Sequence, residues 1–329
     1  MAKLCIVNAG GGAMGVISIT FLQHLEAYVQ KTYSIKLNDI VDFVSGTSVG
    51  GIINGTFAAG VPYSDIYDMM TRKLDKAFYR GWLNYLPLSV KYARDKYLMP
   101  MIRELIIKYG KDILSETKIK ALITTTIIGS EYPARRMLPY YFKSYESDYR
   151  SVGKSLSFAI ACSFAAADYF GYIVDDSIKS VYGDGGEGIE NLPFDETIDE
   201  IGSFNWTDPT LVLAIGAGWS DAYQGMTQEQ VYRRNAKRGI IGQIKDFLGI
   251  ARSQAVYDQF FHFYATKKNT PAYSNVSLSY VDIQLPTALD GMDYITHVMD
   301  YVGYGNKMWL DFAVELPKID AIIKEKLLK

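Results

Sequence analysis

The stretch from 40 to 59 constrains the fold more than any other part of the chain, because it passes from a strand to a helix through a sharp serine turn. Residues 40–44 are short and largely apolar, as in a buried strand, and residues 51–59 read as a small-residue helix. Between them the run GTSVG, residues 46–50, matches G-x-S-x-G, a pattern that holds a serine on a tight turn with its hydroxyl pushed outward. This context predicts Ser48 as a nucleophile, and a tight turn without chemistry is the alternative.

Composition limits the class of protein. The 329 residues are enough for one large domain or two small ones, and 49% hydrophobic with 21% charged residues is typical of a globular protein. A formal net charge of -2 gives no argument for nucleic-acid binding. The two cysteines, Cys5 and Cys162, lie in apolar stretches and are expected to be reduced core thiols of a cytosolic protein. We find no signal-peptide core and no apolar run of about 18 residues, so no transmembrane segment is expected.

A second glycine-rich turn follows the first predicted strand, residues 3–8. The run GGGAMG, residues 10–15, leads into an amphipathic helix from about 16 to 30. Its spacing satisfies the dinucleotide fingerprint, so a nucleotide-binding module is one interpretation. That interpretation needs an acidic residue near the carboxyl end of the second strand, whereas Asp42 stands near its beginning.

An oxyanion hole is the interpretation that fits the glycine run better, although a tight turn without a ligand is also open. In a parallel sheet the loops after the first two strands open on the same edge, so the glycine run and Ser48 can meet. We therefore expect the backbone N–H groups of Gly10, Gly11 and Gly12 to stabilise the negative charge that develops in a transition state.

Three more strands are predicted further along the chain. Residues 121–128 are rich in β-forming side chains, and residues 211–215 form a buried-looking strand closed by glycines. The third, residues 178–181, leads to Asp184-Gly185-Gly186. This sequence is a common turn, and its chemical interpretation is a carboxylate presented to Ser48.

The chain divides into a catalytic core at 1–220 and a mainly helical part at 221–329 that packs on it. An aromatic segment at about 77–115 is inserted in the core, as a buried cap or as a lid that faces lipid. The basic residues of 228–265 form either a solvated helix face or a contact for anionic headgroups.

Five motifs, in order over residues 3–218, resemble those of the patatin-like phospholipase family. The glycine run resembles its oxyanion loop, GTSVG its nucleophile turn, and Asp184-Gly185-Gly186 its catalytic Asp-Gly-Gly/Ala loop. Residues 162–170 are similar to its small-residue block, and residues 215–218 to its Ser-x-Gly-Thr-Gly strand end. Two departures stand out, since Met14 replaces the arginine of the motif and Ala9 stands where an acidic residue often precedes the glycines.

The resemblance implies a three-layer α/β/α fold with a mostly parallel central sheet. It also implies a lipid acyl hydrolase, of phospholipase A or lysophospholipase type, in which Ser48 attacks the ester and Asp184 acts as base, with Gly10, Gly11 and Gly12 as oxyanion donors. No metal and no organic cofactor are expected. The implied partner is phospholipid at a membrane surface, and the implied location is cytoplasmic with peripheral membrane contact. The oligomeric state is left open.

Two alternatives to this function remain at the level of the sequence. A Ser-His-Asp esterase would need one of His24, His262 and His297, each of which is more readily interpreted as a structural histidine. A non-catalytic lipid-binding or scaffold protein on the same fold is suggested by Met14 in the oxyanion loop.

Overall fold

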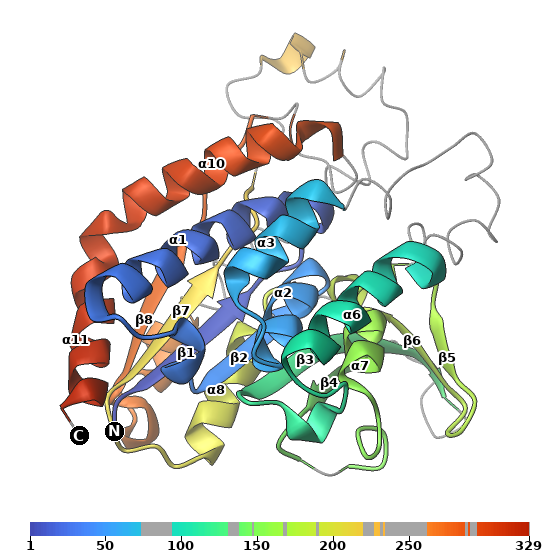
Figure 1. The fold of residues 1–329 in the computed structure, drawn as a ribbon, viewed down its shortest axis with the longest axis horizontal. Helices are drawn as coiled ribbons and strands as arrows, with labels where there is room; N and C mark the ends of the chain where they lie inside the picture. Colours follow the sequence, from blue (N-terminus) through green and yellow to red (C-terminus); the bar gives the residue numbers. More distant parts are fainter. Residues whose placement is uncertain are drawn as a thin grey trace.

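The computed structural model describes residues 1–73, 94–130, 138–146, 148–166, 170–188, 191–219, 227–230, 233, 262–286, 289 and 295–328, and Figure 1 shows their arrangement. The strands are β1 (Lys3–Asn8), β2 (Phe43–Thr47), β3 (Lys120–Ser130), β4 (Leu138–Lys143), β5 (Ile173–Asp175), β6 (Ser180–Asp184), β7 (Thr210–Ile215) and β8 (Val276–Val281). The α-helices are α1 (Gly15–Tyr33), α2 (Val49–Ala58), α3 (Tyr63–Arg72), α6 (Met99–Tyr109), α7 (Leu156–Ser163), α8 (Phe194–Ser203), α10 (Val298–Asp311) and α11 (Leu316–Leu327).

All eight strands belong to one sheet, with the order β5-β6-β3-β2-β1-β7-β8 and β4 paired to β3. The pairs β3–β2, β2–β1, β1–β7 and β7–β8 are parallel, whereas β4 and β6 run antiparallel to β3. The sheet is therefore mostly parallel, and its antiparallel part is confined to one side.

Successive side chains of a strand point to opposite faces of the sheet, so the core has two layers. In β1, Leu4 and Ile6 join the cluster that also holds side chains of α1, α2, α7 and α11. Cys5 and Val7 face the opposite cluster, which includes Phe194 of α8 and Phe263. Helices thus cover both faces, as Figure 1 shows, and the predicted three-layer α/β/α fold is confirmed.

Both cysteines lie in this core, as predicted, and both are free. Burial raises the pKa of the Cys5 thiol and that of the Cys162 thiol well above the ordinary value. Neither thiol is therefore a reactive nucleophile near neutral pH.

Two predicted strand boundaries were wrong for local reasons. The strand before the serine turn begins at Phe43, not at residue 40, because the N–H groups of Ile40 and Val41 both donate to the Leu37 carbonyl oxygen in a preceding turn. The strand before Asp184 spans Ser180–Asp184, not 178–181, because Lys179 lies in the β5–β6 turn with φ 50°.

The part from 221 to 329 also contributes a strand to the sheet, although it was predicted to be mainly helical. Strand β8 pairs in parallel with β7, from Thr210–Val276 to Ile215–Val281. Most of the basic stretch at 228–265, and residues 77–93 of the aromatic segment at 77–115, lie outside the described residues. The described end of that aromatic segment contains α6, which has a proline in its first turn.

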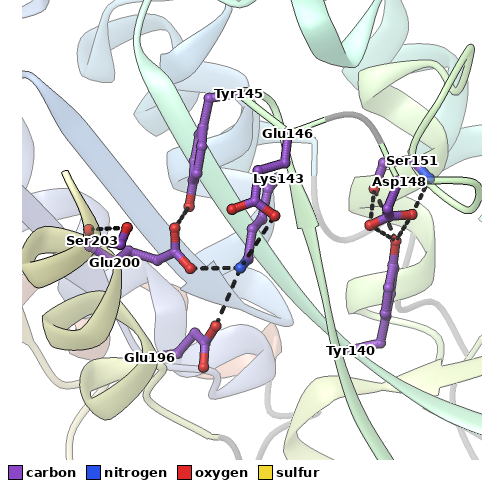
Figure 2. A network of polar contacts seen from close by, with 9 residues as sticks. All are labelled: Tyr140, Lys143, Tyr145, Glu146, Asp148, Ser151, Glu196, Glu200 and Ser203. Atoms are coloured by element: carbon purple, nitrogen blue, oxygen red, sulfur yellow. Dashed lines mark hydrogen bonds and ion pairs between the residues drawn. The ribbon is translucent and has the colours of Figure 1, made fainter.

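A network of charged and phenolic side chains ties α8 to β4 (Figure 2). The Lys143 ammonium lies 2.5 Å from a Glu200 carboxylate oxygen and 3.4 Å from one of Glu196, while the Tyr145 hydroxyl donates to the other oxygen of Glu200 at 2.8 Å. Burial raises the pKa of Glu196 above its ordinary value, even though Lys143 lowers it. The network fixes the helix that follows the Asp184 loop.

Candidate active site

The predicted nucleophile and the predicted base lie where two strands meet end to end along β3. Residues 120–124 of β3 pair with β2, and residues 125–130 pair with β6. Strand β4 pairs with residues 122–127 and so occupies the other edge of β3 across that junction. Since a strand has only two edges, β2 and β6 share one of them, and because they run in opposite directions their carboxyl ends face each other.

The register at this junction places the two site loops side by side. Thr47, the last residue of β2, is the partner of Thr124, and Asp184, the last residue of β6, is the partner of Thr125. We call this junction the β2–β6 seam. Positions 136 residues apart in sequence thus become neighbours through adjacent residues of one strand.

Ser48 occupies a strained turn between β2 and α2. Its backbone has φ 54° and ψ -122°, a conformation that residues with a side chain rarely adopt, at a cost on the order of 1–3 kcal/mol. Its N–H donates to the Ser163 hydroxyl at the end of α7, at 2.8 Å. At Gly50, a Cβ atom would stand only 2.4 Å from the Asn8 carbonyl oxygen, so this position of the turn has no room for a side chain.

The Ser48 hydroxyl donates a hydrogen bond of 2.6 Å to Oδ2 of Asp184. The other carboxylate oxygen of Asp184 accepts the N–H of Gly186 at 2.7 Å. The Asp184 side chain is buried, and Thr126 of β3 donates its hydroxyl to the Asp184 carbonyl oxygen. The carboxylate is thus oriented on both oxygens, with one of them on the serine.

The glycine loop after β1 packs against this pair. A Cβ atom on Gly10 would lie 3.1 Å from the Ser48 Cβ, so the loop backbone passes close to the serine. The Gly10 N–H donates to the Asn191 carbonyl oxygen at 2.8 Å. Gly11 and Gly12 stand at the N-terminal end of the short helix η1 (Gly12–Met14), where amides have no intrahelical acceptor.

The loop after β7 supports the glycine loop from the other side. A Cβ on Gly11 would lie 2.6 Å from the Ala217 Cβ. The neighbouring Gly218 N–H donates to Asp282, which also accepts the Ile283 N–H and the Tyr280 hydroxyl at the end of β8. Burial raises the pKa of Asp282 above its ordinary value, although these three hydrogen bonds lower it.

The predicted pair Ser48 and Asp184 is in direct contact, the Gly10 backbone lies against Ser48, and Gly11 and Gly12 follow in the same loop. The supporting roles of Ser163 and Asn191 were not predicted. Ser163 lies in the small-residue block and Asn191 a few residues after the Asp184 loop, but the partners of both are set by tertiary contacts rather than by local spacing.

Asp42 and His24, which belong to the two alternative chemistries, make other contacts. Asp42, the candidate for a nucleotide ribose, ion-pairs with Lys3 and Lys326 at the amino end of β2. His24 shares a hydrogen bond with Asn306 between α1 and α10. The group that accepts the Ser48 hydroxyl is thus a carboxylate, not an imidazole.

Two further observations concern the described residues alone. They contain no group of three or more His, Cys, Asp or Glu side chains arranged to hold a metal ion. Their helices include none with the length and apolarity needed to cross a bilayer.

Comparison with known proteins gives relatives described as patatin-like proteins and as phospholipases. The chain is 30% identical over 159 residues to Patatin-like protein 4 of Arabidopsis thaliana, covering 45% of this chain and 37% of that protein. It is 28% identical over 207 residues to a cGAMP-activated phospholipase of Vibrio cholerae, covering 56% of this chain and 54% of that protein. The chain thus spans about half the length, or less, of these two relatives.

Solved structures are more distant. VipD from Legionella pneumophila is 12% identical, with a TM-score of 0.40 over 92% of this chain and 66% of that chain. Human GIVD cytosolic phospholipase A2 is also 12% identical, with a TM-score of 0.37 over 71% and 45%.

The profile of the family described as Patatin-like phospholipase matches residues 6–198, a range that contains the end of β1, the glycine loop, the Ser48 turn and the Asp184 loop. The match covers more than half of the 329 residues. This chain belongs to the patatin-like phospholipase family.

Proposed function

We propose that this protein hydrolyses fatty-acyl esters of glycerophospholipids at a membrane surface, through an acyl intermediate on Ser48 and with Asp184 as the base. The observation that carries the proposal is the hydrogen bond of 2.6 Å from the Ser48 hydroxyl to the Asp184 carboxylate. Family membership supports a lipid hydrolase in general, and the assignment of roles rests on this contact.

The proton of Ser48 must move while the new bond forms. With a hydroxyl pKa near water's ~15.7 and a carboxyl pKa near ~3.9, complete prior transfer to an aspartate would cost on the order of 16 kcal/mol. No alkoxide therefore accumulates. Transfer to Asp184 accompanies the attack, and the short hydrogen bond already aligns donor and acceptor.

The reaction then has two balanced halves. Ser48 Oγ bonds to the ester carbonyl carbon as its proton passes to Asp184; the tetrahedral intermediate collapses, and the departing glycerol oxygen takes that proton. A water molecule next attacks the acyl-serine while its proton passes to Asp184. The fatty acid leaves as Ser48 Oγ recovers the proton.

Backbone amides stabilise the negative charge on the substrate oxygen. Because the Gly10 N–H is already bonded to Asn191, Gly11 and Gly12 are the donors we assign to the oxyanion, while Gly10 provides the close approach to Ser48. Each such donor contributes ~2.7–4 kcal/mol in the transition state. Helix α2 begins at Val49, directly after the serine, and the positive end of its dipole adds to this stabilisation.

Labelling with a fluorophosphonate and hydrolysis of mixed phospholipid micelles test this function. We expect the wild type to be labelled at Ser48 and to release fatty acid, with no need for an added metal. Ser48→Ala should lose both signals, whereas Ser203→Ala, an exposed serine on α8, should retain both. Parallel assays on lysophospholipids distinguish the two phospholipase types.

Folded wild-type protein that is not labelled and releases no fatty acid would contradict the proposal. If such protein bound phospholipid vesicles, it would be a lipid-binding protein on the same fold.

A further inference from the structure

Asn191 holds the backbone of Gly10 on both sides. Its own carbonyl oxygen accepts the Gly10 N–H at 2.8 Å, and its side-chain Nδ2 donates to the Gly10 carbonyl oxygen at 3.3 Å. The two residues are 181 positions apart in sequence. One residue therefore makes both backbone contacts between the glycine loop and the chain that follows the Asp184 loop.

The side chain of Asn191 also lies between the two loops. A Cβ atom on Gly10 would stand 2.6 Å from Asn191 Oδ1, and a Cβ on Gly186 would stand 3.2 Å from the same atom. Gly186 is the residue whose N–H orients the Asp184 carboxylate. Asn191 thus contacts the residue next to the oxyanion donors and the residue that holds the base.

Because a peptide group is planar, the contact between Asn191 and the Gly10 carbonyl also affects the oxyanion hole. The Gly10 carbonyl and the Gly11 N–H belong to one planar peptide, which is trans, so the two groups point in opposite directions. A hydrogen bond that fixes the Gly10 carbonyl oxygen on Asn191 therefore also fixes the direction of the Gly11 N–H, away from Asn191.

We propose that Asn191 is a positioning residue that aims the Gly11 amide at the oxyanion and couples the glycine loop to the Asp184 loop. The proposal rests on the proposed function for its effect on turnover, but the placement of the loop itself does not. Asn191 does not touch the reacting atoms in this assignment, and it acts through Gly10 and Gly186.

Two substitutions separate its side chain from its backbone. Asn191→Asp keeps the shape but replaces the Nδ2 donor with an oxygen that repels the Gly10 carbonyl oxygen. Asn191→Ala removes the side chain and keeps the carbonyl that accepts the Gly10 N–H. Asn205→Asp is the matched control, because its Nδ2 also donates to a carbonyl oxygen at 3.3 Å, that of Ser203, in an exposed turn.

Removal of one oxyanion donor lowers kcat by ~10²–10³. Because a misdirected amide retains part of its effect, we expect Asn191→Asp and Asn191→Ala to lower kcat and the rate of fluorophosphonate labelling by about 10–100-fold, with little change in KM. In Asn191→Asp, the added negative charge beside Asp184 should also move the acidic limb of the kcat/KM profile to higher pH. A purely structural role would lower the melting temperature without either signature.

Hydrogen exchange of a peptide that covers residues 9–15 gives a readout independent of activity. We expect faster exchange in both variants than in the wild type and Asn205→Asp. Exchange and kcat equal to those of Asn205→Asp would overturn the proposal. An inactive wild type would refute the proposed function alone, since the exchange comparison would still decide whether Asn191 holds the loop. If Asn191→Asp does not fold, Asn191→Ala provides the same comparison.

Discussion

The two halves of the sheet supply the candidate site in different ways. In the parallel half, the neighbouring strands β2, β1 and β7 all end at the same edge, where the serine turn, the glycine loop and the 216–218 loop lie together. In the antiparallel half, β6 alone reaches the site, and it arrives from the opposite direction. The positions of Ser48 and of the glycine loop thus follow from parallel topology, whereas the position of Asp184 requires a reversal of the chain.

The largest effect is expected when Asp184, the contribution of the antiparallel half to the site, is replaced. Asp184→Asn can still accept the Gly186 N–H through Oδ1 but has no carboxylate to take the serine proton, so kcat should fall by on the order of 10³-fold. Steady-state hydrolysis measures it, with Asp300→Asn on α10 as the control. Activity within tenfold of wild type would show that the base lies elsewhere.

The next largest effect is expected in the parallel half, where Gly50→Ala should destabilise the fold. A Cβ on Gly50 meets the Asn8 carbonyl oxygen at 2.4 Å, and neither backbone can move away cheaply, so Gly50→Ala should lower the free energy of unfolding by about 3 kcal/mol. Urea denaturation measures this. In the antiparallel half, Gly129→Ala is the control, because among the described residues its Cβ would meet only Val181 Cγ2, at 4.0 Å. Equal losses in the two variants would contradict the expectation.

A smaller effect is expected at the β2–β6 seam itself, where substitutions of Thr124 and Thr125 can be compared. The Thr125 hydroxyl contacts the carbonyl oxygens of Cys162 and Gly183, at 3.0 and 2.8 Å, so Thr125→Val should cost about 1–2 kcal/mol. The hydroxyl of Thr124 is buried without a hydrogen-bond partner among the described residues. Thr124→Val should therefore leave the unfolding free energy unchanged or raise it. Thermal unfolding of both variants measures which one is less stable. A greater loss of stability in Thr124→Val than in Thr125→Val would contradict the expectation.

The smallest effect concerns the α8 network of Figure 2. Because burial raises the folded-state pKa of Glu196, its protonated form favours folding, and that stability is lost as pH rises from about 4.3 through the raised value. Glu196→Gln should remove this loss, with a gain of less than ~1 kcal/mol at pH 7. Unfolding free energies at pH 4 and pH 7 measure it. A variant that kept the wild-type pH dependence over this interval would show that another group is responsible.

The parallel half was the more predictable part of the fold. Strands β1 and β7 match their predicted ranges closely, because each is an apolar run closed by glycines. Strand β8 was missed because its sequence, VSLSYV, alternates with serines and lacks such a run, although four of its six residues are buried.

The meeting of Ser48 and Asp184 was expected from motif resemblance, but its structural cause was not. The seam depends on how β2 and β6 divide one edge of β3, and pairing register is a tertiary property that no local pattern records. Ser163 and Asn191 were missed for a related reason, since each acts on a backbone group far away in sequence.

The backbone of Ser48 has a wider consequence. A residue held at φ 54° and ψ -122° lies in a conformation that glycine tolerates far better than serine. Selection for thermal robustness alone would therefore favour loss of the hydroxyl at this position. A serine is therefore expected to remain at residue 48 only where its hydroxyl has a function, so a glycine at this position in a relative would indicate that the function has been lost.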